Sequence, residues 1–297
     1  MLQFILDTLL RTADLAPIAL GLSLVYGLVR FANVAHVQYA MVGSFMTAAL
    51  LRIGCPFLLA ILLASVLTGA MATLLHHGIF RRLAQSGPAS AMIGSLAVSM
   101  ILIALILGIA GSSPVSYNLP LSPTLSLADS FVSRNQLWTL GVTLALLVAF
   151  GALLFYTSLG RSIRALASNR DLAAASGLNA DALVHTVNFI AGTLAGLGGS
   201  MLALNSSAYV NQGSDLLLPI LAAAILGGLG NPLGAVFGAL LIAATETLVT
   251  NLDFGWLFGS ELVFIPVTYI NAASFVILLL ALLLRPYGLF NREVRRV

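Results

Sequence analysis

The chain has 297 residues, of which 60% are hydrophobic and 8% charged, with a formal net charge of +3. A soluble domain carries about 25% charged residues, so the composition excludes an ordinary soluble protein and indicates a membrane protein. All 13 basic residues are arginine. A chain without lysine contains no conventional phosphate-binding P-loop and forms no Schiff base, and a lone cysteine, Cys55, excludes cysteine-cluster metal sites.

Apolar runs long enough to cross a bilayer recur along the whole sequence. Their regular spacing favours helices over a barrel. We therefore expect an all-α, polytopic membrane bundle of about eight or nine spans, formed by the single domain 1–297, with broken helices and one surface helix. An amphipathic interfacial helix should precede the first span. The expected membrane segments are 15–30, 34–51, 57–75, 90–110, 137–156, 184–204, 215–230, 232–250 and 262–284.

The first polar group lies in the stretch ALGLSLVYGLVRFANVAHVQYAMVGSF, residues 19–45. Asn33, His36, Gln38 and Tyr39 fall together near membrane depth, where polar groups are costly unless they face protein, water or substrate. A lone histidine is more often structural than a ligand. The cluster favours a helix broken here and capped by Asn33, beside a translocation path.

Most of the positive charge lies on three segments that we expect to be loops. These are 76–89 with Arg81 and Arg82, the segment 158–183 with three arginines, and the tail from Arg285. The number of spans between them lets all three share one side, which the positive-inside rule makes cytoplasmic. The loop 111–136 then faces outward. Nine crossings would place the N-terminus outside, whereas eight follow if the short segments beside Asn33 and Asn231 are half-helices.

The segment 158–183 is an island of charge between two apolar runs. A polar helix held at the membrane surface suits docking to a soluble partner, although an ordinary polar loop is an equal alternative. Alanine at the observed spacing gives a slim helix, and Gly177 should end it. The residues expected to carry the docking contacts are Arg161, Arg164, Arg170, Asp171, Ala173, Gly177 and Asp181.

A third polar group lies in LGGLGNPLGAVFGALLIAATETL, residues 226–248. Weak helix formers from Gly227 to Pro232, including Gly228, Gly230 and Asn231, indicate a second broken helix, which persists in a membrane only where it is buried or lines a cavity. Glu246 follows on the next span. It is either a carboxylate that lines the path or pairs at a gate, or an interfacial residue bonded to a neighbouring helix. The G-x-x-x-G pairs 192/196 and 234/238 predict close helix packing.

These three regions resemble the permease subunits of branched-chain amino acid ABC importers, of the type paired with a second, similar permease. The similarity covers nearly the full chain: residues 19–45 match the family's Asn-Phe-Ala-His-Gly stretch, 160–199 its cytoplasmic loop, and 219–246 its glycine-rich motif. Val34 stands where the family has Phe, Val37 where it has the final Gly, and Asp171 where Glu is usual. The valines put leucine-type specificity in doubt.

The resemblance implies a multi-pass subunit of the bacterial cytoplasmic membrane that is not itself an enzyme. It binds no cofactor, because ATP and magnesium are held by two cytoplasmic ATPase subunits. The other implied partners are a homologous permease, a periplasmic or lipid-anchored solute-binding protein and membrane lipid, with no nucleic acid. The implied solute is a branched-chain or other amino acid, and the alternative is urea, a short amide or a small carboxylate. An ion-coupled transporter working alone is the alternative of another class, and neither a metal site nor an intramembrane enzyme is indicated.

Overall fold

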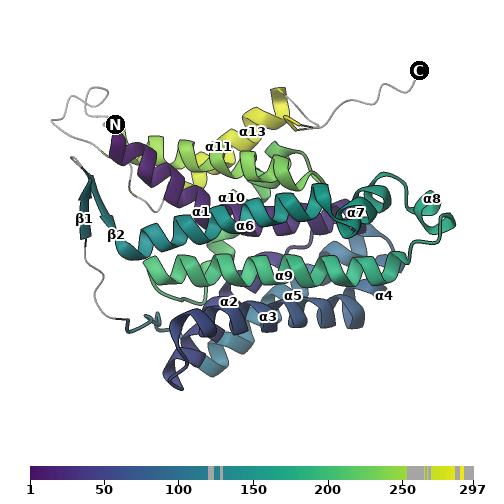
Figure 1. The fold of residues 1–297 in the computed structure, drawn as a ribbon, viewed down its shortest axis with the longest axis horizontal. Helices are drawn as coiled ribbons and strands as arrows, with labels where there is room; N and C mark the ends of the chain where they lie inside the picture. Colours follow the sequence, from purple (N-terminus) through teal and green to yellow (C-terminus); the bar gives the residue numbers. More distant parts are fainter. Residues whose placement is uncertain are drawn as a thin grey trace.

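The computed structural model describes residues 1–119, 124–127, 130–252, 264, 266, 269–284 and 288–290. Its helices run roughly along one long axis (Figure 1). In chain order they are α1 (Leu2–Val29), α2 (His36–Arg52), α3 (Phe57–Leu75), the π-helical turn η1 (His76–Phe80), α4 (Arg81–Gln85), α5 (Pro88–Ala110), α6 (Arg134–Tyr156), α7 (Ser158–Ser168), α8 (Arg170–Ala175), α9 (Ala180–Asn205), α10 (Gln212–Gly227), α11 (Pro232–Asn251) and α13 (Ile270–Leu284).

The expected all-α membrane bundle is confirmed at this level. Among the described residues, six helices are long and apolar enough to cross a membrane: α1, α3 with its continuation to Gln85, α5, α6, α9 and α11. The remaining apolar helices α2, α10 and α13 are shorter. The count of eight or nine full spans stays a prediction, and part of the last expected span, 262–284, lies outside the described residues.

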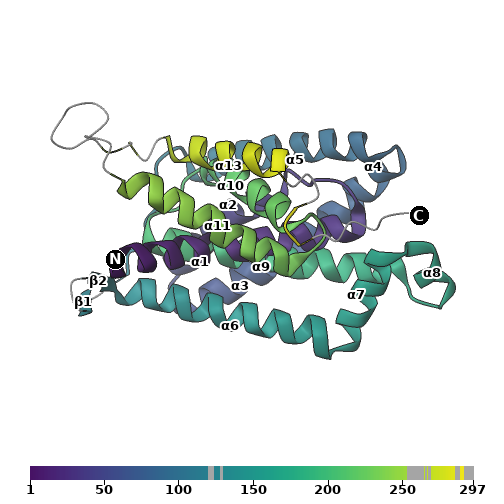
Figure 2. The ribbon, with the colours of Figure 1, turned by 90° about the horizontal axis from the view of Figure 1, so that it is seen from above.

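Two long helices, α1 and α9, form the centre of the bundle. They lie side by side between α6 and α13 (Figure 2), and α9 also packs against α2 and α3. Most of the span of each is buried, whereas α5 and α6 expose large apolar side chains such as Ile93 and Leu144. Apolar faces left outward on a polytopic protein suit contact with lipid tails.

The close approach of α9 to α3 and of α11 to α10 follows from the predicted glycine pairs. A Cβ atom on Gly196 would meet Thr68 of α3 at 2.8 Å, and one on Gly199 would overlap the backbone of Ala40. Gly234 and Gly238 of α11 leave the same kind of room for α10. Small residues let membrane helices pack through their backbones, so the packing interpretation of these pairs is confirmed.

The bundle has two chemically different ends. Arg81 of α4 bonds Asp181 of α9 at 2.5 Å, which places the 76–89 and 158–183 segments together. This is the Arg-rich end, with α4, α7 and α8 (Figure 1). The opposite end, where α1 starts, carries the strands β1 (Thr124–Leu127) and β2 (Ser130–Ser133) and is called the hairpin end. Two of the three basic segments thus share one end as predicted. Of the tail from Arg285 only residues 288–290 are described, where Leu289 N bonds the Leu226 carbonyl of α10 at 2.8 Å, and its arginines lie outside the described residues.

Three local expectations were wrong. The interfacial helix and first span are one continuous helix, α1, because Arg11 on its polar side meets a partner inside the bundle. The segment 76–89 is helical as far as Gln85, since the stop signal is Gly87 followed by Pro88 at the start of α5. The loop 111–136 contains an antiparallel hairpin, in which Thr124 lies opposite Ser133, and the sequence TLSL of its first strand alternates as strands do.

Candidate functional site

The first break in the helical bundle lies between α1 and α2, at residues 30–35. Arg30 ends α1 in the left-handed conformation, with φ 59° and ψ 24°. Its Nη2 donates to the carbonyl of Ala167 on α7 at 2.5 Å, and the backbone N–H of Val34 donates to Ser95 Oγ of α5 at 3.0 Å. The break is therefore held by contacts to other helices.

Asn33 does not cap α2, which corrects the expectation from the sequence. The N-cap position is Ala35, and no side chain makes the cap bond. The Asn33 side chain is buried near the Tyr39 hydroxyl, and neither Asn33 Oδ1 nor that hydroxyl makes a hydrogen bond of normal geometry. The backbone carbonyl of Asn33 accepts from His36 N instead, so a backbone turn starts the helix.

Helix α2 begins inside the bundle. His36 Nε2 lies 3.3 Å from the carbonyl of Ile18, and a Cβ on Gly21 would meet the same ring at 2.9 Å. Gly21 precedes the end of α1 by eight residues, or about 12 Å of helix. His36, Gln38 and Tyr39 are thus all placed well within the bundle, each no more than 2% exposed.

Helix α10 also begins inside the bundle, and its first turn meets the first turn of α2. Gln38 Nε2 bonds Ser214 Oγ at 3.4 Å, and Gln212 Nε2 bonds the carbonyl of Gly199 on α9 at 3.1 Å. Gln212 Oε1 accepts from Ser44 at 2.8 Å, while Tyr117 from the 111–119 loop donates to the Ser44 carbonyl at 3.0 Å. The sequence analysis missed Gln212 and Tyr117, because neither stands in a recognisable motif.

The second break separates α10 from α11, as predicted. Gly228 and Gly230 adopt φ 90° and 89°, a region that side chains other than glycine rarely enter. Asn231 caps α11 by accepting from Gly234 N at 3.1 Å, and Pro232 occupies the first turn. A Cβ on Gly230 would lie 3.2 Å from Gly27 Cα of α1. The second break therefore packs against the last turn of α1, which directly precedes the first break.

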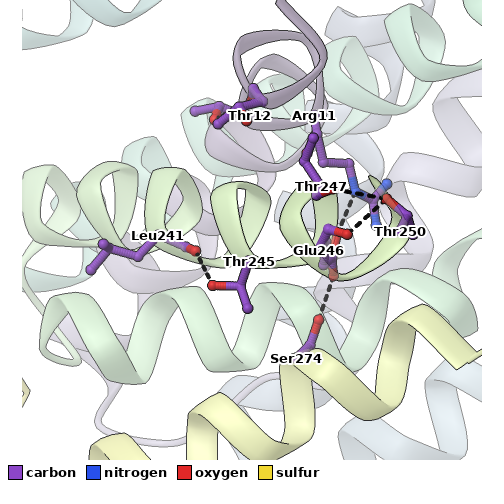
Figure 3. Close-up of polar contacts among 9 residues, drawn as sticks. Arg11, Thr12, Leu241, Thr245, Glu246, Thr247, Thr250 and Ser274 are labelled. Atoms are coloured by element: carbon purple, nitrogen blue, oxygen red, sulfur yellow. Dashed lines mark hydrogen bonds and ion pairs between the residues drawn. The ribbon is translucent and has the colours of Figure 1, made fainter. Parts of the chain in front are cut away.

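Glu246 forms the most buried ion pair among the described residues (Figure 3). Its Oε2 accepts from Arg11 Nε of α1 at 2.6 Å, and its side chain is 0% exposed against 25% for Arg11. Ser274 of α13 donates to the other carboxylate oxygen. The pair joins three helices towards the hairpin end. Removing one partner of a buried pair leaves an uncompensated charge, which costs about 3–5 kcal/mol.

The predicted surface helix of the 158–183 segment is two short helices, α7 and α8, separated at Asn169, whose side chain caps α8. Gly177 follows α8 with φ 89° and open space around its Cα. This confirms that it turns the chain away from a helix. Arg161 and Asp171 are exposed, and Ala173 is buried.

The remaining polar residues of this segment contact other parts of the chain. Arg164 folds back to donate to the carbonyl of Leu154 and lies 5.7 Å from the Phe155 ring. Asp181 lies between Arg81, at 2.5 Å, and Arg170, at 3.7 Å. Arg164 and Asp181 are thus engaged within the chain, whereas Arg161 and Asp171 point outward.

Helix α7 lies beside both breaks. Ala167 bonds Arg30 of the first break. An open pocket of about 250 Å³ is lined by Ile163 and Arg164 of α7 together with Gly230 and Asn231 of the second break. Helix α7 therefore contacts the first break directly and lies across this pocket from the second.

Comparison with known proteins places this geometry in a family. Residues 4–285 match the family described as branched-chain amino acid transport system, permease component. A probable branched-chain amino acid transport permease, LivH of Methanocaldococcus jannaschii, is 29% identical over 95% of this chain and 90% of its own. The permease BraD of the high-affinity system in Pseudomonas aeruginosa is 27% identical over 100% and 98%.

A solved structure shares the fold. The complex of PsaBC from Streptococcus pneumoniae with a Fab contains a chain that superposes with a TM-score of 0.52 at 15% identity, covering 94% of this chain and 91% of that one. At such low identity the likeness concerns the arrangement of helices alone.

Proposed function

This chain belongs to the permease family of branched-chain amino acid transport systems, and on that premise we propose that it forms one half of the channel of an ATP-driven importer. It is a multi-pass membrane protein, which we place in the bacterial cytoplasmic membrane with the Arg-rich end inward. The other half would be a homologous permease. Two cytoplasmic ATPase subunits would hold ATP and magnesium, and a periplasmic or lipid-anchored protein would deliver the solute.

The proposed solute is a branched-chain or other small amino acid. The relatives that match over nearly their full length are named for branched-chain amino acids. The departures at Val34 and Val37 lie within or beside the first break and are buried, 8% and 1% exposed. A stiffer turn there alters the space next to His36. Urea, a short amide or a small carboxylate is therefore tested in parallel with leucine.

The mechanism we propose is alternating access driven through α7 and α8. The exposed Arg161 and Asp171 dock on the ATPase subunits, and the change between their two nucleotide states moves α7, since a partner shifts an equilibrium only by its differential affinity. Ala167 passes this movement to the first break through its bond with Arg30. Asn33, His36, Gln38, Tyr39, Gly228, Gly230 and Asn231 then line or gate the path, and Glu246 ties α1 to α11 and α13.

The observation that carries the proposal is the bond from Arg30 of the first break to Ala167 of α7, in a chain matched to the family over residues 4–285. The test replaces Gly177 with leucine. Leucine at φ 89° costs about 1–2 kcal/mol locally and changes the path of the chain beyond α8. Gly54→Leu is the matched control, because Gly54 has φ 85° and equally open surroundings but lies in the turn between α2 and α3.

Uptake and ATP hydrolysis are measured in proteoliposomes containing the full complex and its binding protein. We expect Gly177→Leu to lower the solute transported per ATP about tenfold while hydrolysis continues, and Gly54→Leu to leave this ratio unchanged. Equal ratios for both variants would contradict the role of α8. Uptake by the isolated chain along an ion gradient without ATP would support the alternative of an ion-coupled transporter.

A further inference from the structure

A polar pocket at the Arg-rich end has no role in the mechanism above. It has a volume of about 360 Å³. One side is formed by η1 and α4, and the other by the starts of α8 and α9. Its lining includes His76, Arg81, Gln85, Arg170, Asp181 and His185.

The charges of this pocket favour an anion. Two guanidinium groups face one carboxylate: Arg81 lies 2.5 Å and Arg170 3.7 Å from Asp181. Arg170 is too distant for a hydrogen bond with the carboxylate and is 56% exposed. The pocket therefore carries net positive charge even with neutral histidines, and Arg170 keeps its N–H donors available.

Three imidazole rings gather at the same place. The ring centroid of His185 lies 5.7 Å from that of His76 and 5.2 Å from that of His77. His185 Nδ1 is buried and makes no hydrogen bond, although a buried polar atom normally has a partner. Among the described residues, no three histidine, cysteine, aspartate or glutamate side chains are arranged to hold a metal ion.

The backbone here departs from a regular α-helix. His76 and His77 begin the π-helical turn η1, and such turns occur frequently at functional sites. The turn widens the helix where α3 continues into α4. It brings the histidine pair and Arg81 to face His185 and Asp181 of α9 across the pocket.

We propose that this pocket binds an oxyanion, namely a phosphate group, through Arg81, Arg170 and His185. Guanidinium groups form strong, charge-assisted hydrogen bonds with phosphate oxygens. Placed where the basic segments meet the membrane surface, the pocket can take the headgroup of an anionic phospholipid or free phosphate. A bound phosphate would join α4 to the starts of α8 and α9, beside the proposed docking residue Asp171.

The test uses the full chain in detergent and three variants. His185→Gln and Arg170→Gln each remove one proposed donor, and Arg82→Gln is the control, because Arg82 is an exposed neighbour on α4 outside the pocket lining. Inorganic phosphate is titrated by calorimetry. Retention of phosphatidylglycerol against phosphatidylcholine is measured by native mass spectrometry, and thermal unfolding confirms that each variant folds.

We expect either variant of the pocket to weaken binding about tenfold, with Arg82→Gln unchanged. If this holds for inorganic phosphate, the free anion is the ligand. If it holds only for phosphatidylglycerol, the ligand is a lipid headgroup. The proposal is overturned if neither probe binds, or if all four proteins bind both probes equally. Neither measurement depends on transport, so failure here leaves the proposed function untouched.

Discussion

The two breaks of the bundle lie close together but are built differently. At residues 228–231 the chain itself supplies the interruption: glycines with positive φ, an asparagine that caps the next helix and a proline in its first turn. At residues 30–35 a non-glycine residue, Arg30, has positive φ, and no side chain caps α2. Bonds to α5 and α7 hold that region instead.

The difference indicates which break depends on its surroundings. A break encoded in its own sequence keeps its shape when neighbouring helices move. A break held by Ala167 of α7 and Ser95 of α5 changes its shape when α7 or α5 shifts. We therefore expect the second break to act as a fixed turn, and the first to respond to α7. Substitutions at or near the two breaks test this distinction when the stability of the purified chain is measured in detergent.

The largest effect is expected for Gly227→Val at the end of α10. A side chain there would overlap the backbone of Gly234, and the two helices that flank the second break cannot separate without losing their packing. Overpacking costs about 1–3 kcal/mol and occasionally more, so we expect Gly227→Val to lower the free energy of unfolding by at least about 3 kcal/mol. Thermal unfolding and gel filtration measure it. Gly141→Val on α6, where the site is open, is the control and should be nearly neutral.

Next is Ser95→Ala, which removes the acceptor for the Val34 N–H. A buried backbone donor left without a partner costs about 1–3 kcal/mol. We therefore expect Ser95→Ala to lower the free energy of unfolding by about 2 kcal/mol, although Ser95 lies on α5 and not in the first break. Ser99 is one turn further along α5 and similarly buried, at 4% exposed, and has no bond to residues 30–35 among those described. If Ser99→Ala costs as much, the break does not depend on Ser95.

Features that depend on the backbone preferences of neighbouring residues could be predicted from the sequence. Gly228, Gly230, Asn231 and Pro232 indicated the second break because each has a backbone preference of its own. The position of the first break was also predicted, but its capping residue was wrong. Asn33 is a good cap by type, yet the chain closes the turn through backbone atoms.

Contacts between distant segments were not predictable in this way. Glu246 was recognised as a costly buried carboxylate, but its partners Arg11 and Ser274 lie 235 and 28 residues away along the chain. Arg11 was instead assigned to an interfacial helix, since an amphipathic pattern does not show which surface its polar side meets. The bond from Arg30 to Ala167 was missed for the same reason, because it spans 137 residues.

A smaller effect separates the two asparagines. Asn231→Ala should cost about 1 kcal/mol, the usual value of an N-cap, because it removes the acceptor for Gly234 N. Asn33→Ala should change stability by less than about 0.5 kcal/mol, since the side-chain oxygen Oδ1 of Asn33 has no hydrogen-bond partner to lose. Denaturation curves compare the two. If Asn33→Ala is the more damaging, the first break is encoded by its own side chains after all.

The smallest effect concerns Arg30, where glycine and alanine are compared. Both substitutions remove the bond to Ala167, but only glycine relieves the left-handed conformation, which costs other residues about 1–2 kcal/mol. Glycine also loses about 0.5–1 kcal/mol through its freedom in the unfolded chain, so Arg30→Gly should be more stable than Arg30→Ala by about 0.5–1 kcal/mol. At Arg161, inside α7, the order should reverse, because alanine is the better helix former by about 1 kcal/mol. If glycine is the less stable choice at both positions, the left-handed turn at Arg30 is not what ends α1.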